Sequence, residues 1–266
     1  MIKKRKDFYL LFFLLFFYQY AFAQNTQLNN KYSDSVSSIQ FNTLSYKNER
    51  IKPISFIIPA SMVAYGVWAV NNDYLKKFDR RVNKEIFLDN PHPAVRIDDY
   101  LQYTPAAAVF GLNAFGIKGK HKMLDAGAIY LMSNAIMSGI VVSIKKTTPV
   151  MRPDMSNDNS FPSGHTAAAF VSAEFLLNEY IDVSPWIGIA GYGAAFLTGY
   201  LRMYNNKHWF SDIVAGAGIG VISTKLAYLL YNEIQPRLLK NKGKNTIILP
   251  SYQNGSWGVN LVKTLE

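Results

Sequence analysis

The chain contains no cysteine among its 266 residues and only four histidines, and charged residues make up just 17% of it. Without cysteine the protein cannot form a disulfide, use a thiolate nucleophile or bind a metal through sulfur. The small number of histidines makes a full zinc site difficult to assemble, because His92 and His121 lie in other loops than the remaining two. Hydrophobic residues make up 49% of the chain, which excludes a disordered protein and favours a membrane protein or one large core.

The charged residues that are present are mostly basic, and the formal net charge is +10. A basic chain can bind nucleic acid, an anionic membrane surface or an anionic small substrate. We find no basic helix face with interleaved aromatic residues, so we expect no nucleic-acid partner. A membrane and an anionic substrate remain as the favoured partners.

Residues 1–23 have the pattern of an export signal. Four basic residues from Lys3 to Lys6 precede an apolar run from Phe8 to Tyr18, and Ala21-Phe22-Ala23 offers a small-x-small cleavage site. The alternative is an uncleaved anchor helix, although the apolar run is short for a membrane span. Both interpretations place the protein in the cell envelope and expose the mature chain to an extracytoplasmic compartment.

The rest of the sequence predicts an all-α domain over residues 54–236, preceded by a polar lead-in at residues 24–53. Six helix-length apolar segments lie in this domain, and small residues in the longer ones permit close helix packing. The segments are Ile54–Val70, Pro105–Ile117, Met123–Ile144, Thr166–Ile181, Pro185–Leu201 and Trp209–Ile234. Between the first two, residues 71–103 are polar, and we expect short surface helices there.

The tail at residues 244–266 differs from the helical domain. Thr246–Leu249 and Trp257–Val262 are strand-like, and Asn254-Gly255 between them is a strong tight-turn pattern. The sequence therefore predicts a short C-terminal β-hairpin attached to a six-helix body.

Three short stretches carry the residues that we expect to act on a substrate. The first separates Lys145 from Arg152-Pro153 by six residues, the second is Pro162-Ser163-Gly164-His165, and the third is Arg202-x5-His208-x3-Asp212. A helix that starts near Ser163 would offer free backbone N–H groups to an oxyanion, and Gly164 would let a ligand approach the backbone closely. Taken singly, these residues have plainer explanations: a solvated helix cap for the cations, an N-cap for Ser163 and a surface position for His165.

His208 and Asp212 are four residues apart at the predicted start of the last helix, so they share one of its faces. Asp212 can accept a hydrogen bond from one ring nitrogen of His208, which leaves the other nitrogen free to attack a substrate. The alternatives are a surface ion pair and two ligands of a zinc site.

In an up-down bundle, the loops after the third and fifth segments and the starts of the fourth and sixth lie at the same end. One pocket could therefore receive all three stretches. Three cations and helix-terminal N–H groups match a phosphate whose charge is spread in the transition state, and two histidines supply a nucleophile and an acid. This chemistry needs neither a metal nor a cofactor.

The three stretches resemble the signature of the type 2 phosphatidic acid phosphatase (PAP2) family, which shares its site with vanadium haloperoxidases and bacterial non-specific acid phosphatases. The family pattern is Lys-x6-Arg-Pro, then Pro-Ser-Gly-His, then Ser-Arg-x5-His-x3-Asp. The chain departs from it at one position, Leu201, where the family has serine. The resemblance covers about residues 123–230 and implies a PAP2-like helical bundle with its active site at one end.

The resemblance also implies a role for each matching residue. His208 attacks phosphorus to form a phosphohistidine, and Asp212 orients His208. His165 protonates the leaving oxygen and then helps water to hydrolyse the intermediate. The phosphate oxygens are bound by Lys145, Arg152, Arg202, Ser163 and the backbone N–H of Gly164.

We therefore expect a metal-independent phosphatase that hydrolyses a phosphomonoester or a pyrophosphate, with a phosphorylated lipid or a prenyl pyrophosphate as its substrate. The sequence does not distinguish phosphatidic acid, phosphatidylglycerol phosphate, undecaprenyl pyrophosphate and lipid A phosphate. The alternatives are a soluble periplasmic acid phosphatase, a vanadium-dependent haloperoxidase and a non-catalytic scaffold. Small size and compact spacing from Arg152 to Ser163 count against the haloperoxidase, and the retention of both histidines counts against the scaffold.

Helix hydrophobicity favours a membrane enzyme, because the fifth and sixth segments are long enough to span a bilayer. Lys225 is a charged residue inside the sixth segment, so its side chain must face protein or reach an interface. The linker from Lys118 to Lys122 is typical of a cytoplasmic turn, which would leave the active loops facing the periplasm. A cleaved signal with six spans would reverse this orientation. A retained N-terminal helix, an interfacial second segment or a soluble periplasmic enzyme would each resolve the conflict.

Overall fold

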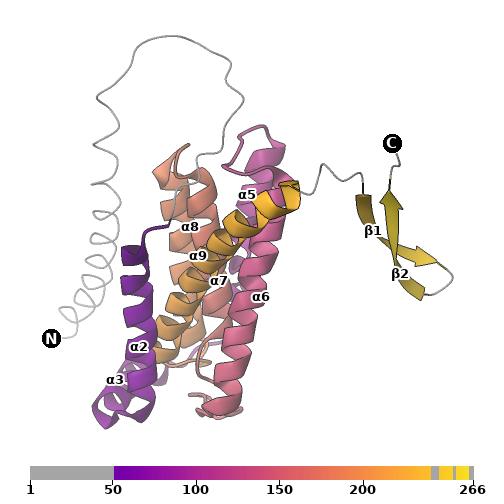
Figure 1. Ribbon diagram of the computed structural model, residues 1–266. Helices are drawn as coiled ribbons and strands as arrows, with labels where there is room; N and C mark the ends of the chain where they lie inside the picture. The colour runs from indigo at the N-terminus through magenta and orange to yellow at the C-terminus, as the bar shows by residue number, and fades with distance from the viewer. Residues whose placement is uncertain (1–50, 241–245, 254–255, 264–266) are drawn as a thin grey trace. The chain divides into compact units, whose positions relative to one another are not determined.

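The computed structural model describes residues 51–240, 246–253 and 256–263 (Figure 1). The predicted export signal, the polar lead-in up to residue 50 and the turn at Asn254-Gly255 lie outside the described residues.

Residues 51–240 are helical, which confirms the predicted all-α class. The longer helices coincide with the apolar segments of the sequence, and the polar stretch between residues 71 and 103 adds three short elements. The six predicted segments therefore correspond only to the apolar helices of the structure. The elements are η1 (Pro53–Phe56), α2 (Ile57–Asn71), α3 (Asp73–Asn83), η2 (Lys84–Leu88), α4 (Asp98–Leu101), α5 (Thr104–Ala114), α6 (Met123–Thr147), α7 (Gly164–Tyr180), α8 (Pro185–Tyr204) and α9 (Phe210–Lys240).

Two strands follow α9 in the sequence. β1 (Thr246–Gln253) and β2 (Ser256–Lys263) pair antiparallel, with Thr246 opposite Lys263 and Gln253 opposite Ser256.

The helices begin where the local sequence allows it. Pro105 and Pro185 occupy the first turns of α5 and α8, where a missing N–H and a fixed φ are tolerated. Asn72 caps α3 by accepting a hydrogen bond from the backbone N of Leu75 at 3.0 Å, and Ser163 caps α7 in the same way.

Helix α7 is the centre of the bundle and contacts α5, α6, α8 and α9. Almost all of its side chains are buried, so it has apolar residues on every face rather than one stripe. Its first turn lies directly against α9: a β-carbon at Gly216 would come within 2.5 Å of the carbonyl oxygen of Ser163. Glycine at this position therefore sets the spacing between the Ser163 stretch and α9.

The charge at Lys225 is neutralised inside the bundle. Its Nζ lies 2.7 Å from Oε1 of Glu174 on α7, and both side chains are buried. Tyr192 on α8 donates a further hydrogen bond to the same carboxylate. Lys225 therefore faces protein, and the network joins α7, α8 and α9.

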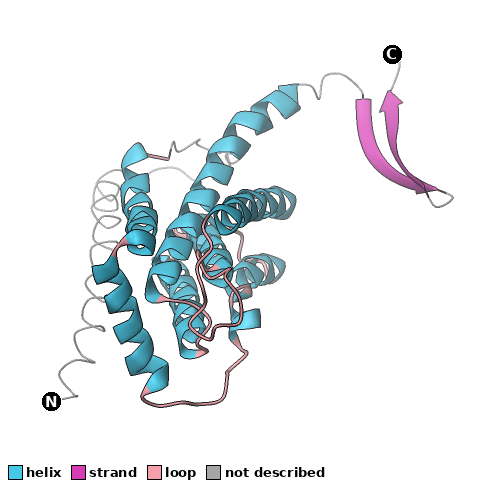
Figure 2. Cartoon of the chain, turned by 90° about the horizontal axis from the view of Figure 1, so that it is seen from below, coloured by secondary structure: helices cyan, strands magenta, loops and turns pink. Residues whose placement is uncertain are grey.

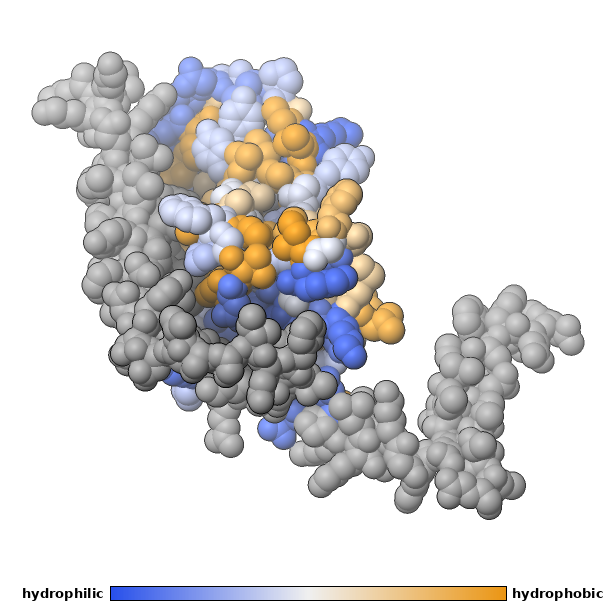
Figure 3. All heavy atoms as spheres, turned by 90° about the horizontal axis from the view of Figure 1, so that it is seen from above, coloured by the Kyte–Doolittle hydropathy of each residue, from blue (hydrophilic) through white to orange (hydrophobic). Residues whose placement is uncertain are grey.

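Among the described residues, three helices are long and apolar enough to cross a membrane: Pro53–Asn71, Met123–Thr147 and Phe210–Gln235. The first two have mostly exposed windows, as lipid-facing helices require, and apolar side chains are exposed on the surface seen in Figure 3. Helix α8, the fifth predicted segment, is long enough to span but is not one of the three. Its glycines and tyrosines lower its hydropathy, and it packs heavily on α7.

The loop between α6 and α7, the loop between α8 and α9 and the short helices α3 and α4 are gathered at one end of the bundle. Figure 2 views this end from below, with loops crossing the ends of the helices. This end holds all three stretches that the sequence predicts to act together.

Candidate active site

His208 lies in the loop that joins α8 to α9, where only 2% of the residue is exposed. Its Nδ1 is 3.4 Å from Oδ2 of Asp212 in the first turn of α9. The same carboxylate oxygen accepts hydrogen bonds from Ser160 Oγ at 2.5 Å and from the backbone N of Trp209 at 2.9 Å. Asp212 is thus held from two sides, and the imidazole that faces it has Nε2 left for chemistry.

The His208 ring is held in its neutral form. Burial lowers the pKa of His208 to about 4, although Asp212 acts in the opposite direction. Arg202 and Lys145 add to the effect of burial, because their positive charges disfavour the imidazolium. A neutral imidazole at physiological pH has the free lone pair that a nucleophile needs.

The three predicted cations come from three different segments. Lys145 is in the last turn of α6, Arg152 lies in the loop that follows, and Arg202 is in the last turn of α8. Lys145 donates from Nζ to the carbonyl oxygen of Asn159 at 2.5 Å. Burial lowers the pKa of the Arg152 guanidinium, and Arg202 is the next cause, so the two arginines lie close enough to repel one another.

Two guanidinium donors in this cluster have no hydrogen-bond partner in the part of the chain that the structure describes. They are Nε of Arg152 and Nε of Arg202, and both atoms are buried. A buried donor without a partner costs on the order of 1–3 kcal/mol, so such atoms call for an explanation. Directed donors beside a neutral nucleophile are suited to the oxygens of an oxyanion.

The Ser163 stretch has its hydroxyl engaged as a helix cap. Ser163 Oγ accepts from Oγ1 of Thr166 at 2.9 Å, and the Ser163 backbone N donates to the carbonyl oxygen of Asp212 at 3.1 Å. Gly164 begins α7, so its N–H is not used by the helical ladder. A β-carbon at Gly164 would meet only Val141, at 3.9 Å, so the backbone here is open to close approach.

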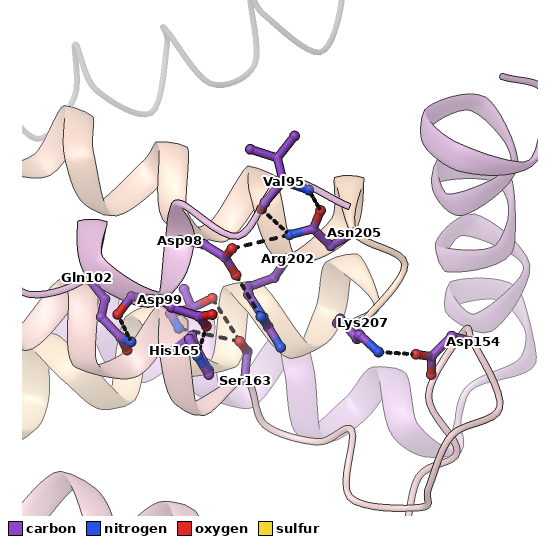
Figure 4. Close-up of polar contacts among 11 residues, drawn as sticks. Val95, Asp98, Asp99, Gln102, Asp154, Ser163, His165, Arg202, Asn205 and Lys207 are labelled. Atoms are coloured by element: carbon purple, nitrogen blue, oxygen red, sulfur yellow. Dashed lines mark hydrogen bonds and ion pairs between the residues drawn. The ribbon is translucent and has the colours of Figure 1, made fainter. Parts of the chain in front are cut away.

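His165, the second predicted histidine, pairs with an aspartate. Its Nε2 lies 3.0 Å from Oδ1 of Asp99 on α4, and both side chains are partly exposed. Burial and Arg202 lower the pKa of His165, whereas the hydrogen bond that His165 donates to Asp99 raises it. Figure 4 shows His165 turned towards Asp99, beside the pair that Arg202 forms with Asp98.

The pair of Arg202 and Asp98 is almost fully buried, with Nη1 2.6 Å from Oδ2. Asn205 Nδ2 donates to the other carboxylate oxygen of Asp98 at 3.2 Å. These bonds fix the direction of the guanidinium, which leaves the rest of its edge for a ligand. No cluster of three His, Asp or Glu side chains suited to a metal ion occurs within the described ranges.

Residues 126–236 match the family model of the PAP2 superfamily. The chain is therefore similar to this superfamily over these residues. The match covers all three stretches of the candidate site.

Two curated relatives share part of the chain. Lipid A 1-phosphatase of Porphyromonas gingivalis is 40% identical over 137 residues, which are 50% of this chain and 30% of that protein. Bacitracin transport permease protein BcrC of Bacillus licheniformis is 32% identical over 101 residues, which are 33% of this chain and 48% of that protein. The chain thus spans only 30% and 48% of the lengths of these two relatives.

Two crystal structures are similar to the fold. LpxE of Aquifex aeolicus has 23% identity and a TM-score of 0.43 and aligns with 57% of this chain and 93% of its own. The first transmembrane PAP2-type phosphatidylglycerolphosphate phosphatase from Bacillus subtilis has 20% identity and a TM-score of 0.48, with coverage of 68% and 97%.

The structure adds partners that the sequence pattern of the PAP2 superfamily did not reveal. Ser160 holds Asp212, while Asp98 and Asp99 hold Arg202 and His165. Asp98 and Asp99 lie before residue 126, outside the family match. Two adjacent carboxylates in a polar stretch were the one available indication, and no local spacing links them to histidines or arginines that lie more than 60 residues away.

Proposed function

We propose that the protein hydrolyses a phosphomonoester or a diphosphate carried by a lipid, through a phosphohistidine on His208. The observation that carries this proposal is a buried neutral imidazole held by Asp212 beside three cations. Two of these cations have buried donors with no partner among the described residues. That arrangement offers a nucleophile and a site for an oxyanion in the same place. The match of residues 126–236 to the PAP2 superfamily model supports it.

In the first step, the Nε2 lone pair of His208 attacks phosphorus, and the bond from phosphorus to the leaving oxygen breaks. His165 gives its proton to that oxygen. In the second step, water attacks the phosphohistidine and transfers a proton to His165, and the phosphorus–nitrogen bond breaks. Free His208 and inorganic phosphate result, and His165 is again protonated for the next turnover.

The remaining residues act on charge and orientation in this scheme. Lys145, Arg152 and Arg202 stabilise the charge on the equatorial oxygens of the transferred phosphoryl group. The N–H of Gly164 and the positive end of α7 add to this field, with Ser163 holding the first turn of α7 in place. Asp99 stabilises the protonated form of His165, which must donate a proton first. No metal or other cofactor enters the scheme.

A lipid-linked substrate is supported by two observations. Three helices within the described ranges are long and apolar enough to cross a membrane, which supports a site near a bilayer surface. The relative from P. gingivalis acts on a phosphorylated lipid according to its name. Prenyl pyrophosphates have the same combination of phosphate and apolar chain, so they are the second substrate class to test.

The test is phosphate release by the purified full-length protein in detergent. The panel compares lipid A, phosphatidylglycerol phosphate, phosphatidic acid, undecaprenyl pyrophosphate and a water-soluble ester, each with unsubstituted protein and with His208→Ala. We expect release from at least one lipid, none with the variant and no change after EDTA. Faster turnover of the soluble ester than of every lipid would favour the acid phosphatase alternative, and equal release by the variant would exclude His208 as nucleophile.

We further propose that the active site faces the periplasm. The basic linker from Lys118 to Lys122 supports this orientation, because it lies at the other end of the bundle against Glu179. Because the chain has no cysteine, thiols introduced by Ser156→Cys and Lys122→Cys can be labelled without background. A membrane-impermeant reagent added to intact spheroplasts should label the first alone, and labelling of the second alone would reverse the orientation.

A further inference from the structure

Helix α3 starts where a candidate membrane span ends. The span Pro53–Asn71 leads through a single residue, Asn72, into Asp73 at the start of α3. If α2 crosses the bilayer, α3 must therefore lie at the membrane surface on the side of the active site. Exposed aromatic side chains flank the junction, Trp68 on α2 and Tyr74 on α3, as is typical of the interface between lipid and water.

One face of α3 packs against the rest of the protein. Phe78 and Val82 pack on Phe210, Met203 and Ile213, and the rings of Phe78 and Phe210 meet edge to face at 5.6 Å. Asp79 and Asn83 extend the same face with buried hydrogen bonds to α9 and to the loop that carries His208. This face is therefore unable to bind a partner.

Four cations form a stripe on another face of α3 and the first residue of η2. Lys77, Arg80, Arg81 and Lys84 follow the i, i+3, i+4, i+7 spacing of one helix face, and all four are exposed. None of them forms an ion pair with any residue that the structure describes. The stripe is a row of four exposed positive charges with no ion pair among the described residues.

This stripe does not serve the stability of α3. Like charges four residues apart repel one another, as Lys77 does with Arg81 and Arg80 with Lys84. A favourable interaction with the helix dipole accounts for cations in the last turn, Arg80 and Arg81, but not for Lys77 in the middle. Such a row is stable when an anionic surface supplies the missing counter-charges.

We propose that the basic stripe of α3 binds the anionic phospholipid headgroups of the leaflet beside the active site. The charge of the stripe, its exposure and its place directly after a candidate span all favour this occupant. Bound lipid would press α3 against the loop that carries His208, because the opposite face of α3 holds Ser211 and Asn206. The inference depends on a membrane position for α2 and not on the phosphatase activity.

The test measures which lipids lie near α3 and needs no turnover. Full-length protein with Tyr74→Cys, labelled with a fluorescent dye, is placed in phosphatidylcholine nanodiscs. These contain equal low fractions of headgroup spin-labelled phosphatidylglycerol or headgroup spin-labelled phosphatidylcholine. We expect stronger quenching by the phosphatidylglycerol label, on the order of fivefold for each cation that reaches the surface, with the excess falling as salt is raised.

Two variants on this background decide the result. Replacement of Lys77, Arg80, Arg81 and Lys84 by Gln should equalise quenching by the two lipids, with helix content by circular dichroism unchanged. The double variant Lys77→Gln, Lys84→Gln should lose part of the excess quenching by phosphatidylglycerol. The control double variant Lys118→Gln, Lys122→Gln, at the opposite end of the bundle, should lose none of it. Equal quenching in the Tyr74→Cys protein, or an excess that survives all four replacements, would overturn the proposal.

Discussion

Asp79 on α3 accepts two hydrogen bonds from Ser211 on α9, one from the backbone N at 3.1 Å and one from Oγ at 2.5 Å. Ser211 is the residue before Asp212, whose carboxylate faces His208. Both Asp79 and Ser211 are buried. The helix that follows the first candidate span therefore fixes the first turn of α9, where the proposed nucleophile is oriented.

The bond between Asp79 and Ser211 should be measurable as a coupling energy. Asp79→Ala leaves the N–H and hydroxyl of Ser211 without a partner, which costs about 1–3 kcal/mol of stability. A double-mutant cycle with Ser211→Ala should give a coupling of about 1–2 kcal/mol in thermal unfolding of the detergent-solubilised protein. Asp79→Ala should also lower kcat with little change in KM, and additive stability effects would refute the coupling.

Asp79 should also make folding stability depend on pH. Burial raises the pKa of Asp79 to about 6, against the opposing hydrogen bonds from Ser211. A carboxyl whose folded pKa exceeds its unfolded value stabilises the fold when protonated, so this contribution falls as pH rises from about 4 to about 6. The unfolding temperature of Asp79→Asn should lack this part of the pH profile. Parallel profiles for the two proteins would show that Asp79 does not titrate in this range.

The proposed roles of the two histidines can be separated by the leaving group. His165→Ala should slow hydrolysis of an alkyl phosphate far more than that of p-nitrophenyl phosphate, because a phenolate of low pKa leaves without a proton. His208→Ala should slow both by roughly 10⁴-fold or more. Asp212→Asn should cost roughly 10²–10⁴-fold for both substrates, since it misorients the nucleophile. Equal losses for the two substrates in His165→Ala would argue against its role as the acid.

Asp99 should set the alkaline limb of the rate profile. Its hydrogen bond to His165 raises the pKa of that imidazole, which burial and Arg202 lower. Activity requires protonated His165 and is lost as pH rises through this pKa, so Asp99→Asn should move the alkaline limb of kcat/KM to lower pH. The exposed Asp158→Asn, in the neighbouring loop, is a matched control that should leave the limb in place. An unshifted limb in Asp99→Asn would remove Asp99 from the proton-donating unit.

The sequence predicted the parts of the site that local spacing determines. The interval of four residues predicted that His208 and Asp212 lie close together, and Nδ1 of His208 is 3.4 Å from Oδ2 of Asp212. His208 lies in the loop just before α9, however, and not on a face of that helix. A helix start at Ser163 and helix ends near Lys145 and Arg202 follow from hydrophobic segments and their boundaries. In an up-down bundle these boundaries meet at the same end.

Contacts set by tertiary packing could not be predicted in the same way. Asp98 lies 104 residues from Arg202, Asp99 66 residues from His165 and Asp79 132 residues from Ser211. All three carboxylates belong to the polar stretch at residues 71–103. This stretch has no apolar helical stripe long enough to predict where it packs on the bundle. A membrane span at α8 stays a prediction, because α8 has the length of a span but its glycines and tyrosines lower its hydropathy.

Vanadate should bind through the two guanidinium donors that have no partner among the described residues. Vanadate has the charge and shape of phosphate and can expand to the trigonal bipyramid of phosphoryl transfer, so it should inhibit competitively and raise the unfolding temperature. Arg152→Lys and Arg202→Lys should each lose roughly tenfold or more in vanadate affinity, because lysine keeps the charge but not the Nε–H in a fixed plane. Lys146→Gln removes an exposed cation one residue from Lys145 and should leave the affinity unchanged. If the two lysine variants bound vanadate as tightly as the unsubstituted protein, the buried Nε atoms would not be the donors to the oxyanion, and charge alone would account for binding.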